Sequence, residues 1–173
     1  DAIQVEGFDF GNSPFHYMDE RIKGQTIVIT TTNGTQAIEV SKNAHKVVIG
    51  SFLNIDALCS WLVEQQKNVL LLCSGWKNKF NLEDALFAGA VTDEILKRSD
   101  QYRHGDGCLA LKYLYRMAEE DPNKFLNHSF HKERLVRLNL KKDIKYCLTP
   151  NQTNIIPVLH DGALMPMNQL VDC

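Results

Sequence analysis

The 173-residue sequence lacks several features that mark common classes of protein. It has no large excess of either charge, since 19 basic and 21 acidic residues leave a net charge of −2. A basic surface for nucleic acid or for an anionic membrane is therefore not expected. It also has no apolar run near the roughly 20 residues that cross a bilayer, and its first residues do not have the pattern of a signal peptide. These absences predict no nucleic-acid partner, no membrane and a cytoplasmic location.

The sequence also lacks closely paired cysteines, which excludes further classes of protein. The five cysteines are Cys59, Cys73, Cys108, Cys147 and Cys173. No C-x-x-C pair occurs, so neither a zinc cage nor a disulfide framework is indicated, and reduced thiols are expected. The sequence also lacks a D-x-D motif, which excludes the aspartyl-phosphate phosphatases from this portion. Cys73 and Lys79 have the spacing of the cysteine-phosphatase signature C-x₅-R, but lysine cannot form the bidentate fork that this signature needs.

The length fits one ordinary domain with a substantial core, so residues 1–173 are predicted to form a single α/β domain. The sequence begins with Asp1 rather than methionine, and residues 1–14 already look like the middle of a domain. We therefore expect the chain to be a fragment, or one piece of a longer protein.

Strand and helix patterns alternate through the first hundred residues. Apolar, β-branched runs predict strands at 26–31, 46–50 and 68–73, and the segments between and after them predict helices at 35–43, 55–66 and 82–98. This alternation predicts a mostly parallel sheet with helices on both faces. The later portion is expected to be helical, at 109–120, 130–140 and 141–148, and to end in an edge strand at 155–159 that contains Pro157.

In a parallel sheet, every strand-to-helix loop emerges at the same edge, where ligands of open α/β sheets bind. That edge would collect three loops that are far apart in the sequence, at 32–35, 51–54 and 74–84. We therefore expect these loops to share one site.

The first of these loops has the composition of a phosphate cradle. Thr32, Asn33, Gly34 and Thr35 place hydroxyl, amide and flexible backbone groups at a predicted helix start, where unpaired N–H groups attract anions. The alternative is that Asn33 and Gly34 only form the turn and a threonine only caps the helix.

The third loop is the most polar. It offers Ser74, Gly75 and Lys79 for binding, and it leads into Glu83 and Asp84 on the first turn of a helix. One or two carboxylates beside a phosphate are the usual protein contribution to a Mg²⁺ site. The alternative is structural, because Asn81 can cap this helix and acidic residues favour its N-terminus.

Two other stretches carry candidate ligands. Asn12 and Ser13 lie in a glycine-rich loop that could hydrogen-bond a ligand or simply lead into the first strand. His131 and Arg134 lie three residues apart on a predicted helix, which is either an ordinary surface helix or one that reaches an anion.

Five motifs in this order resemble the 2-phosphosulfolactate phosphatases, over essentially the whole chain. They are G-F-D-F-G-N-S-P, T-T-T-N-G-T, I-G-S-F-L-N, F-N-L-E-D-A-L-F-A-G-A and S-F-H-K-E-R-L, the last followed by Asp143 and Cys147. The resemblance implies an α/β fold and a Mg²⁺-dependent phosphatase of the coenzyme M pathway, which converts 2-phosphosulfolactate to sulfolactate and phosphate. Carried over by position, it points to Asn12, Ser13, Thr32, Asn33, Gly34, Thr35, Ser74, Gly75, Glu83, Asp84, Ser129, His131 and Arg134.

Two departures from the family pattern are visible. Lys132 stands where the family usually has glycine. The amino-terminal D-V-x-R-A-T-like motif of the family is also missing from these residues, so the chain looks like the C-terminal part of a longer family domain.

The sequence thus predicts a Mg²⁺-dependent phosphatase of a small phosphorylated acid. Asp84 or Glu83 would help to hold the metal, and these two acids and His131 are the predicted catalytic residues. Arg134 or Lys79 would neutralise a second anionic group of the substrate. Two other hypotheses are a binding module that holds phosphate without hydrolysing it and a hydrolase with Cys73 as nucleophile. Homo-oligomer formation is left open.

Overall fold

Helix α3 (Leu82–Arg98) is the longest element of the computed structural model, which describes residues 4–169. The Asn81 side chain caps its start by accepting a hydrogen bond from the Asp84 backbone N–H, 3.0 Å away. Acidic residues occupy the first turn and basic residues the last, as the helix dipole favours. These local signals explain why the predicted bounds of this helix are correct.

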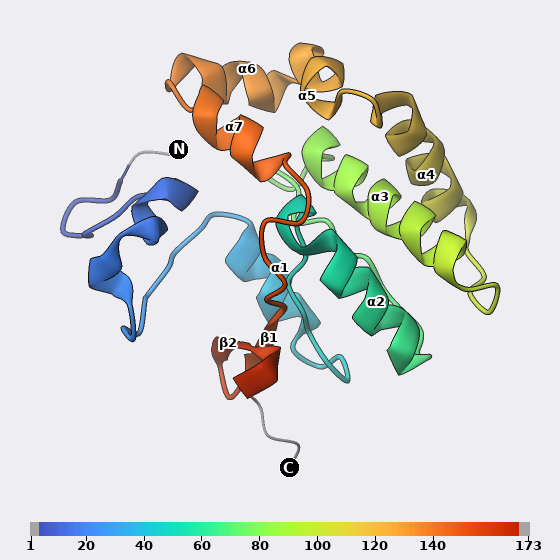
Figure 1. Cartoon of the computed structure of the whole chain (residues 1–173). Helices are drawn as coiled ribbons and strands as arrows, with labels where there is room; N and C mark the ends of the chain where they lie inside the picture. The colour runs from blue at the N-terminus through green and yellow to red at the C-terminus, as the bar shows by residue number, and fades with distance from the viewer. Residues whose placement is uncertain (1–3, 170–173) are drawn as a thin grey trace.

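Helix α3 packs between α4 (Asp106–Ala118) and α2 (Ile55–Gln65), as Figure 1 shows. Contact with α4 is unusually close at Gly89, where an added Cβ would lie 2.1 Å from the Leu111 backbone oxygen. Contact with α2 is made by the apolar face predicted for that helix, whose members are Ile55, Leu58, Cys59 and Leu62. These three helices hold most of the hydrophobic core.

A buried ion cluster also joins α3 to α4. Asp93 has only 1% of its side chain exposed, and it pairs with Lys97 at 2.8 Å and with Arg116 at 2.9 Å. Burial raises the pKa of Asp93, but the hydrogen bonds from Lys97 and Arg116 outweigh it, so the net shift is downward. The carboxylate is therefore held in its charged form inside the helix pair.

The remaining helices lie around these three. They are α1 (Gly34–Ser41), α5 (Pro122–Phe125), α6 (Phe130–Arg137) and α7 (Lys141–Cys147), with 3₁₀ turns at Pro14–Met18, Glu20–Ile22, Phe52–Asn54, Leu126–His128 and Met167–Gln169. All six predicted helices are therefore present, with ends that shift by up to three residues. Between residues 4 and 169, no helix is long and apolar enough to cross a membrane.

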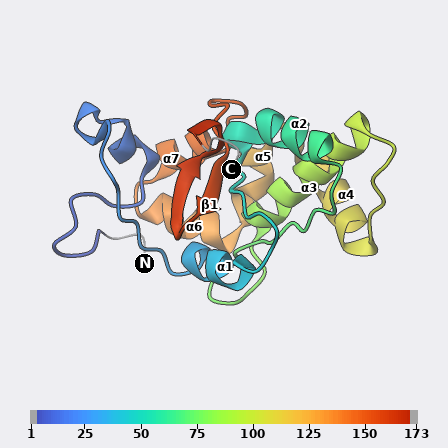
Figure 2. The ribbon, with the colours of Figure 1, turned by 90° about the horizontal axis from the view of Figure 1, so that it is seen from below.

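The sheet is small and antiparallel. Strands β1 (Pro157–His160) and β2 (Ala163–Pro166) form a hairpin, which Figure 2 shows between the amino-terminal segment and helices α2 to α4. On its other side β1 pairs with residues 47–49, since Ile49 N–H donates to the Pro157 oxygen at 2.8 Å and Leu159 N–H donates to the Val47 oxygen at 2.9 Å. The predicted last strand is thus present and is an edge strand of the two-stranded sheet, with one isolated bridge on its other side in which the Pro157 carbonyl accepts.

The expected mostly parallel sheet with helices on both faces is not formed by the described part of the chain. Segments 26–31 and 68–73 contain no strand, and 46–50 contributes only an isolated bridge from Val48 to Val158. The physical reason is that a strand is defined by its partner. These β-branched runs have the composition of strands, but residues 4–169 place no second strand alongside them.

Four cysteines fall in the described range, namely Cys59, Cys73, Cys108 and Cys147, and all four are free thiols, as predicted. Cys173 lies outside that range.

Candidate functional site

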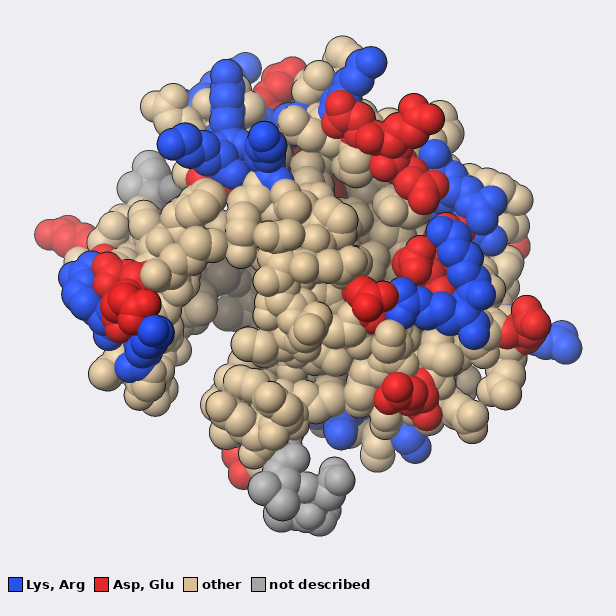
Figure 3. Space-filling model, in the orientation of Figure 1, with Lys and Arg blue, Asp and Glu red and all other residues tan. Residues whose placement is uncertain are grey.

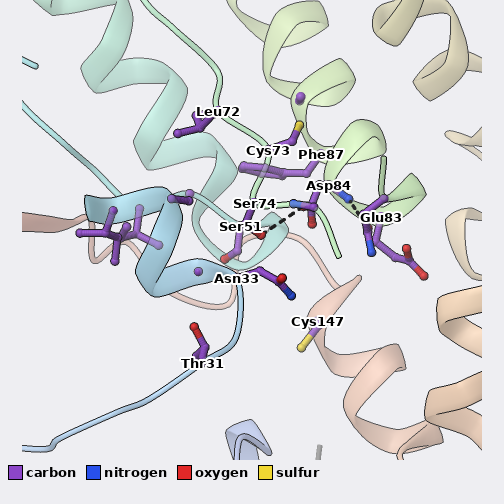
Figure 4. Close-up of a pocket in the computed structure, with 18 of the residues that line it drawn as sticks. Thr31, Asn33, Ser51, Leu72, Cys73, Ser74, Glu83, Asp84, Phe87 and Cys147 are labelled. Carbon is purple, nitrogen blue, oxygen red and sulfur yellow. Dashed lines mark hydrogen bonds between the residues drawn. The ribbon is translucent and has the colours of Figure 1, made fainter. Parts of the chain in front are cut away.

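A cavity of about 1300 Å³ lies among the three loops that the sequence predicted to meet. Asn33, Ser51 and Ser74 all line it, and they lie close together in Figure 4. On the molecular surface, Figure 3 shows a hollow between the amino-terminal region and the rest of this face. The loops therefore converge even though the parallel sheet that was expected to align them is not formed.

The first and third loops are joined by a direct hydrogen bond. The backbone N–H of Lys77 donates to Oδ1 of Asn33 across 3.1 Å. Within the first loop, Oγ1 of Thr31 accepts from the Thr35 N–H at 3.0 Å, and the Thr35 hydroxyl donates to the Thr31 carbonyl at 2.8 Å. Thr35 is thus used to hold the helix start and does not line the cavity, whereas Thr32, Asn33 and Gly34 do.

The third loop is a tight turn held in an uncommon backbone conformation. Trp76 and Lys79 exchange two backbone hydrogen bonds of 3.0 Å, and the two residues between them, Lys77 and Asn78, have φ of 51° and 57°. Glycine is required just before, because Gly75 has φ of 69° and an added Cβ would lie 2.7 Å from the Lys79 oxygen. Lysine in this left-handed region costs about 1 kcal/mol or more, and such strain is found mainly at functional sites.

This conformation brings Lys77, rather than Lys79, to the cavity. Lys79 was predicted as a ligand, but it does not line the cavity. Lys77 Nζ lies 4.9 Å from the centre of the Trp76 ring, and the Arg134 guanidinium carbon lies 5.6 Å from the same centre. Two cations are therefore held against one indole, which attracts them through its π-face. Sequence reasoning missed Trp76 and Lys77, because only the left-handed turn decides which lysine faces inward.

Asp84 is oriented by the third loop. Its Oδ2 accepts from the Gly75 N–H at 2.7 Å and from the Ser74 hydroxyl at 3.2 Å, the contacts drawn in Figure 4. Because Asn81 provides the helix cap, the Asp84 carboxylate is not needed for capping. Ser74 and Gly75 line the cavity as predicted, and in this structure their donors hold a carboxylate.

Glu83 is directed to a different neighbour. Its Oε1 accepts from the Ser129 hydroxyl at 2.8 Å, while Oε2 is buried and has no hydrogen-bond partner among residues 4–169. Ser129 in turn caps α6 by accepting from the Lys132 N–H at 3.2 Å. The two neighbouring carboxylates therefore diverge, as their separation of about 100° around the helix requires.

Helix α6 contributes His131 and Arg134 to the cavity wall. The His131 ring centre is 6.0 Å from that of Trp76, and its Nδ1 is a buried atom without a hydrogen-bond partner in the described residues. Lys132 points elsewhere, since its Nζ donates to Oδ1 of Asn123 at 2.5 Å and to Oδ1 of Asn127 at 2.9 Å. The ammonium group of this unusual lysine therefore braces α6 against the preceding turn, although Lys132 also contributes to the cavity lining.

Cys73 lies at the end of the segment 68–73, near the Asp84 carboxylate, and lines the cavity. Surrounding protein atoms raise the pKa of the Cys73 thiol, and the negative charge of Asp84 raises it further. A nucleophilic cysteine needs the opposite shift. The surroundings thus disfavour the Cys73-dependent hydrolase.

The amino-terminal loop completes the wall with Asn12 and Ser13. Ser13 precedes a 3₁₀ turn but makes no capping bond with its side chain. Of the residues predicted from sequence, those that line the cavity are Asn12, Ser13, Thr32, Asn33, Gly34, Ser74, Gly75, Glu83, Asp84, His131 and Arg134. Their roles in binding or catalysis stay predictions.

A metal ion at this cavity would have few protein ligands. Within the described range, no group of three or more His, Cys, Asp or Glu side chains is placed to hold one. Mg²⁺ needs fewer protein ligands than this, because one or two carboxylates suffice when phosphate oxygens and water complete its coordination shell. The buried Oε2 of Glu83, which has no hydrogen-bond partner in the range, is a hard oxygen of this kind. A single carboxylate at the cavity, that of Asp84 or of Glu83, would therefore be enough for Mg²⁺ if the ion arrived with a phosphorylated ligand.

Comparison with known proteins agrees with the family resemblance of the sequence motifs. A family model described as 2-phosphosulpholactate phosphatase matches residues 1–162. The chain is 40% identical over 164 residues to a protein of Thermotoga petrophila named "Probable 2-phosphosulfolactate phosphatase", and the match covers 95% of this chain and 70% of that protein. A protein of the same name from Caldanaerobacter subterraneus is 35% identical over 161 residues, with 93% and 66% covered.

A third relative with this name, from Clostridium acetobutylicum, is 32% identical over 164 residues, with 95% of this chain and 69% of that protein covered. The chain thus spans about two thirds of the length of the relatives it matches.

Proposed function

Because the chain belongs to the 2-phosphosulpholactate phosphatase family, we propose that its cavity is the phosphate-binding part of a phosphoric monoester hydrolase. The substrate would be a small phosphorylated acid, namely 2-phosphosulfolactate, and the products would be sulfolactate and inorganic phosphate. Relatives that carry this name match more than nine tenths of the chain at 32–40% identity. The reaction would belong to the coenzyme M pathway, as the sequence resemblance implies.

The observation that best supports this proposal is the pair of cations on Trp76. Lys77 and Arg134 come from different loops and helices, yet both lie against the same ring at the cavity wall. 2-Phosphosulfolactate carries a phosphate and two further acidic groups, so a site for it needs more than one positive charge. Arginine also offers a planar fork that suits a sulfonate or a carboxylate.

The neighbouring residues would position the phosphate. The Asn33 side chain fixes Lys77 by accepting a hydrogen bond from the Lys77 backbone N–H. Residues at the start of α1 line the same cavity, and the N-terminus of a helix attracts anions. Thr32 and Gly34 lie at that helix start. Lys77 and the helix start would thus hold the phosphate while Arg134 holds the second acidic group.

Three side chains would carry the chemistry. Asp84 or Glu83 would help to hold Mg²⁺, which when bound neutralises phosphate charge and acidifies a water. Asp84, oriented by Ser74 and Gly75, would also orient the attacking water. His131, which lines the cavity, would donate a proton to the departing alkoxide.

The test combines binding with turnover, using two arginines of the same helix. Arg134→Ala removes a cation that lines the cavity, whereas Arg137→Ala removes an arginine that is 81% exposed and pairs with Glu133. Phosphate release from 2-phosphosulfolactate would be measured with and without Mg²⁺, and inorganic phosphate binding would be followed by ³¹P NMR. We expect Arg134→Ala to reduce turnover by about a hundredfold and Arg137→Ala to leave it unchanged.

The alternatives give different results in the same experiment. Phosphate binding without release from any phosphorylated hydroxy acid would indicate a binding module. Phospholactate lacks the sulfonate. Equal rates with 2-phosphosulfolactate and with phospholactate would contradict the proposed substrate but would still support phosphatase activity. A loss of turnover in a well-folded Cys73→Ser variant would favour the cysteine hydrolase.

A further inference from the structure

A second, smaller cavity lies between α6, α7 and the turn that precedes α6. Its volume of about 620 Å³ falls within the roughly 300–1,000 Å³ of small-molecule sites. Of the described residues that line it, three are the cations Lys132, Arg137 and Lys141, and one, Glu133, is acidic. This second cavity therefore has an excess of positive charge.

Lys132 is a buried cation without a counter-ion in contact. Only 8% of this residue is exposed, and no carboxylate of residues 4–169 lies within 4.0 Å of its ammonium group. Burial lowers the pKa of Lys132, and the more distant charges of Asp121 and Glu83 raise it only in part. Lysine is rarely buried to this extent unless it is paired, because its charge loses the solvation of water. An anion bound next to Lys132 would reduce this electrostatic cost.

The hydrogen bonds of that ammonium group orient two asparagine side chains. Lys132 Nζ donates to the Asn123 carbonyl, to Oδ1 of Asn123 at 2.5 Å and to Oδ1 of Asn127 at 2.9 Å. Because an ammonium group only donates, both side-chain amides must present their oxygen to it. Their NH₂ groups are thereby turned away from the lysine, and they make no hydrogen bond within residues 4–169. Both asparagines line the second cavity, and neither lines the larger cavity of about 1300 Å³.

The remaining charges of the second cavity also favour an anion. Glu133 is paired with Arg137 at 3.7 Å, so these opposite charges largely cancel. Lys141 is exposed and forms no ion pair within residues 4–169, so its ammonium group is available to a ligand. Residues 130–147 carry six basic and two acidic side chains, and Figure 3 shows Lys and Arg gathered over α6 and α7. The local field therefore attracts anions to this part of the surface.

We propose that the second cavity binds the phosphate group of a small molecule. Lys132 supplies a buried charge, and Lys141 supplies a second cation. The NH₂ groups of Asn123 and Asn127 donate to the phosphate oxygens, which accept several hydrogen bonds at once. Neither asparagine nor Lys141 lines the larger cavity, so the inference does not depend on the proposed phosphatase activity.

A phosphate titration of the full 173-residue chain, followed by NMR without Mg²⁺, tests the proposal. The side-chain NH₂ signals of Asn123 and Asn127 report on the second cavity, and the indole N–H of Trp76 reports on the larger one. We expect both asparagine signals to follow one saturating curve. A parallel titration with glycerol phosphate identifies the source of the phosphate group. Tighter binding than that of inorganic phosphate indicates an organic ester, and weaker binding indicates the free ion.

Two adjacent lysines provide a matched comparison. Lys141 and Lys142 are both exposed on α7, but of the two only Lys141 lines the second cavity. Lys141→Ala should weaken phosphate binding at the asparagine signals about threefold to fivefold, whereas Lys142→Ala should leave it unchanged. Lys132→Met removes the buried charge and keeps most of the apolar stem, and it should weaken binding by about tenfold or more.

The inference is wrong if the asparagine signals fail to saturate, or if sodium chloride at equal ionic strength moves them as phosphate does. It is also wrong if Lys142→Ala weakens binding as much as Lys141→Ala, because a diffuse basic surface would then hold the anion. A Trp76 signal that stays unchanged while the asparagine signals saturate would contradict the phosphate site in the larger cavity and leave this inference intact.

Discussion

The side chain of Asn33 accepts a hydrogen bond from the backbone of Lys77, 44 residues further along the chain. This bond connects the first candidate loop to the third, and it supports Lys77 in the left-handed conformation that places its ammonium group over Trp76. One amide side chain thus determines the position of a cation at the cavity.

Asn33→Ala should therefore weaken phosphate binding while leaving the fold intact. A hydrogen bond of this kind contributes about 1 kcal/mol, which corresponds to about a fivefold increase in the dissociation constant. The measurement is a phosphate titration followed by ³¹P NMR. Asn151→Gly is the control, because Asn151 also accepts from a distant backbone N–H, that of Asp56, and its φ of 58° suits glycine. Equal phosphate affinity in both variants would show that Asn33 only forms the turn.

The Asp84 carboxylate and the helix cap can be separated by two substitutions. Asp84→Asn keeps a side-chain oxygen for the Gly75 N–H but removes the charge, so the fold should persist while turnover falls about a hundredfold or more. Asn81→Ala removes the cap and should cost about 1 kcal/mol of stability without lowering turnover per folded molecule. Phosphate release and urea denaturation measure the two effects. Normal turnover in Asp84→Asn would move the catalytic carboxylate to Glu83.

The buried Asp93 should make stability depend on pH. Its pKa is lowered in the folded state, so its stabilisation is present above the unfolded value near 3.9 and is lost as the pH falls through the folded value. Asp93→Asn should cost about 1.5–3 kcal/mol at pH 7, because the hydrogen bonds from the half-exposed Lys97 and Arg116 lose their charged acceptor. Below about pH 4, the difference in unfolding free energy between Asp93→Asn and the unmodified chain should become smaller.

Denaturant unfolding at pH 7 and pH 3 measures this difference. Glu94→Gln on the same helix is the control, since its ion pairs with Lys97 and Arg98 are partly exposed and contribute about 0–1 kcal/mol. The prediction would be contradicted if Asp93→Asn lost no more stability at pH 7 than Glu94→Gln.

The close approach of α3 and α4 predicts opposite effects at two glycines. Gly89→Ala would place a methyl group against the Leu111 carbonyl, and we expect it to destabilise the chain by about 3 kcal/mol or more. Gly107→Ala lies in α4 with no atom within 4 Å of the new Cβ, so it should stabilise by up to about 1 kcal/mol. Thermal unfolding of both variants compares them directly. Similar midpoints would show that the helices separate easily at this crossing.

The sequence by itself determined the helices and predicted many of the residues that line the cavity. Caps, apolar faces and end charges are local signals, so the bounds of α3 and the buried face of α2 were predicted from residues close in sequence. The convergence of the three loops was also predicted correctly, although from a parallel sheet that the described residues do not form.

Tertiary structure alone decided the pairing of strands and the direction of individual side chains. Residues 69–73 have the composition of a strand, but composition does not supply a neighbour, and hydrogen bonds between strands depend on distant parts of a chain. Likewise, Lys77 rather than Lys79 reaches the cavity because a left-handed turn and the distant Asn33 side chain fix its backbone. A backbone conformation stabilised by a residue 44 positions away leaves no local signal in the sequence.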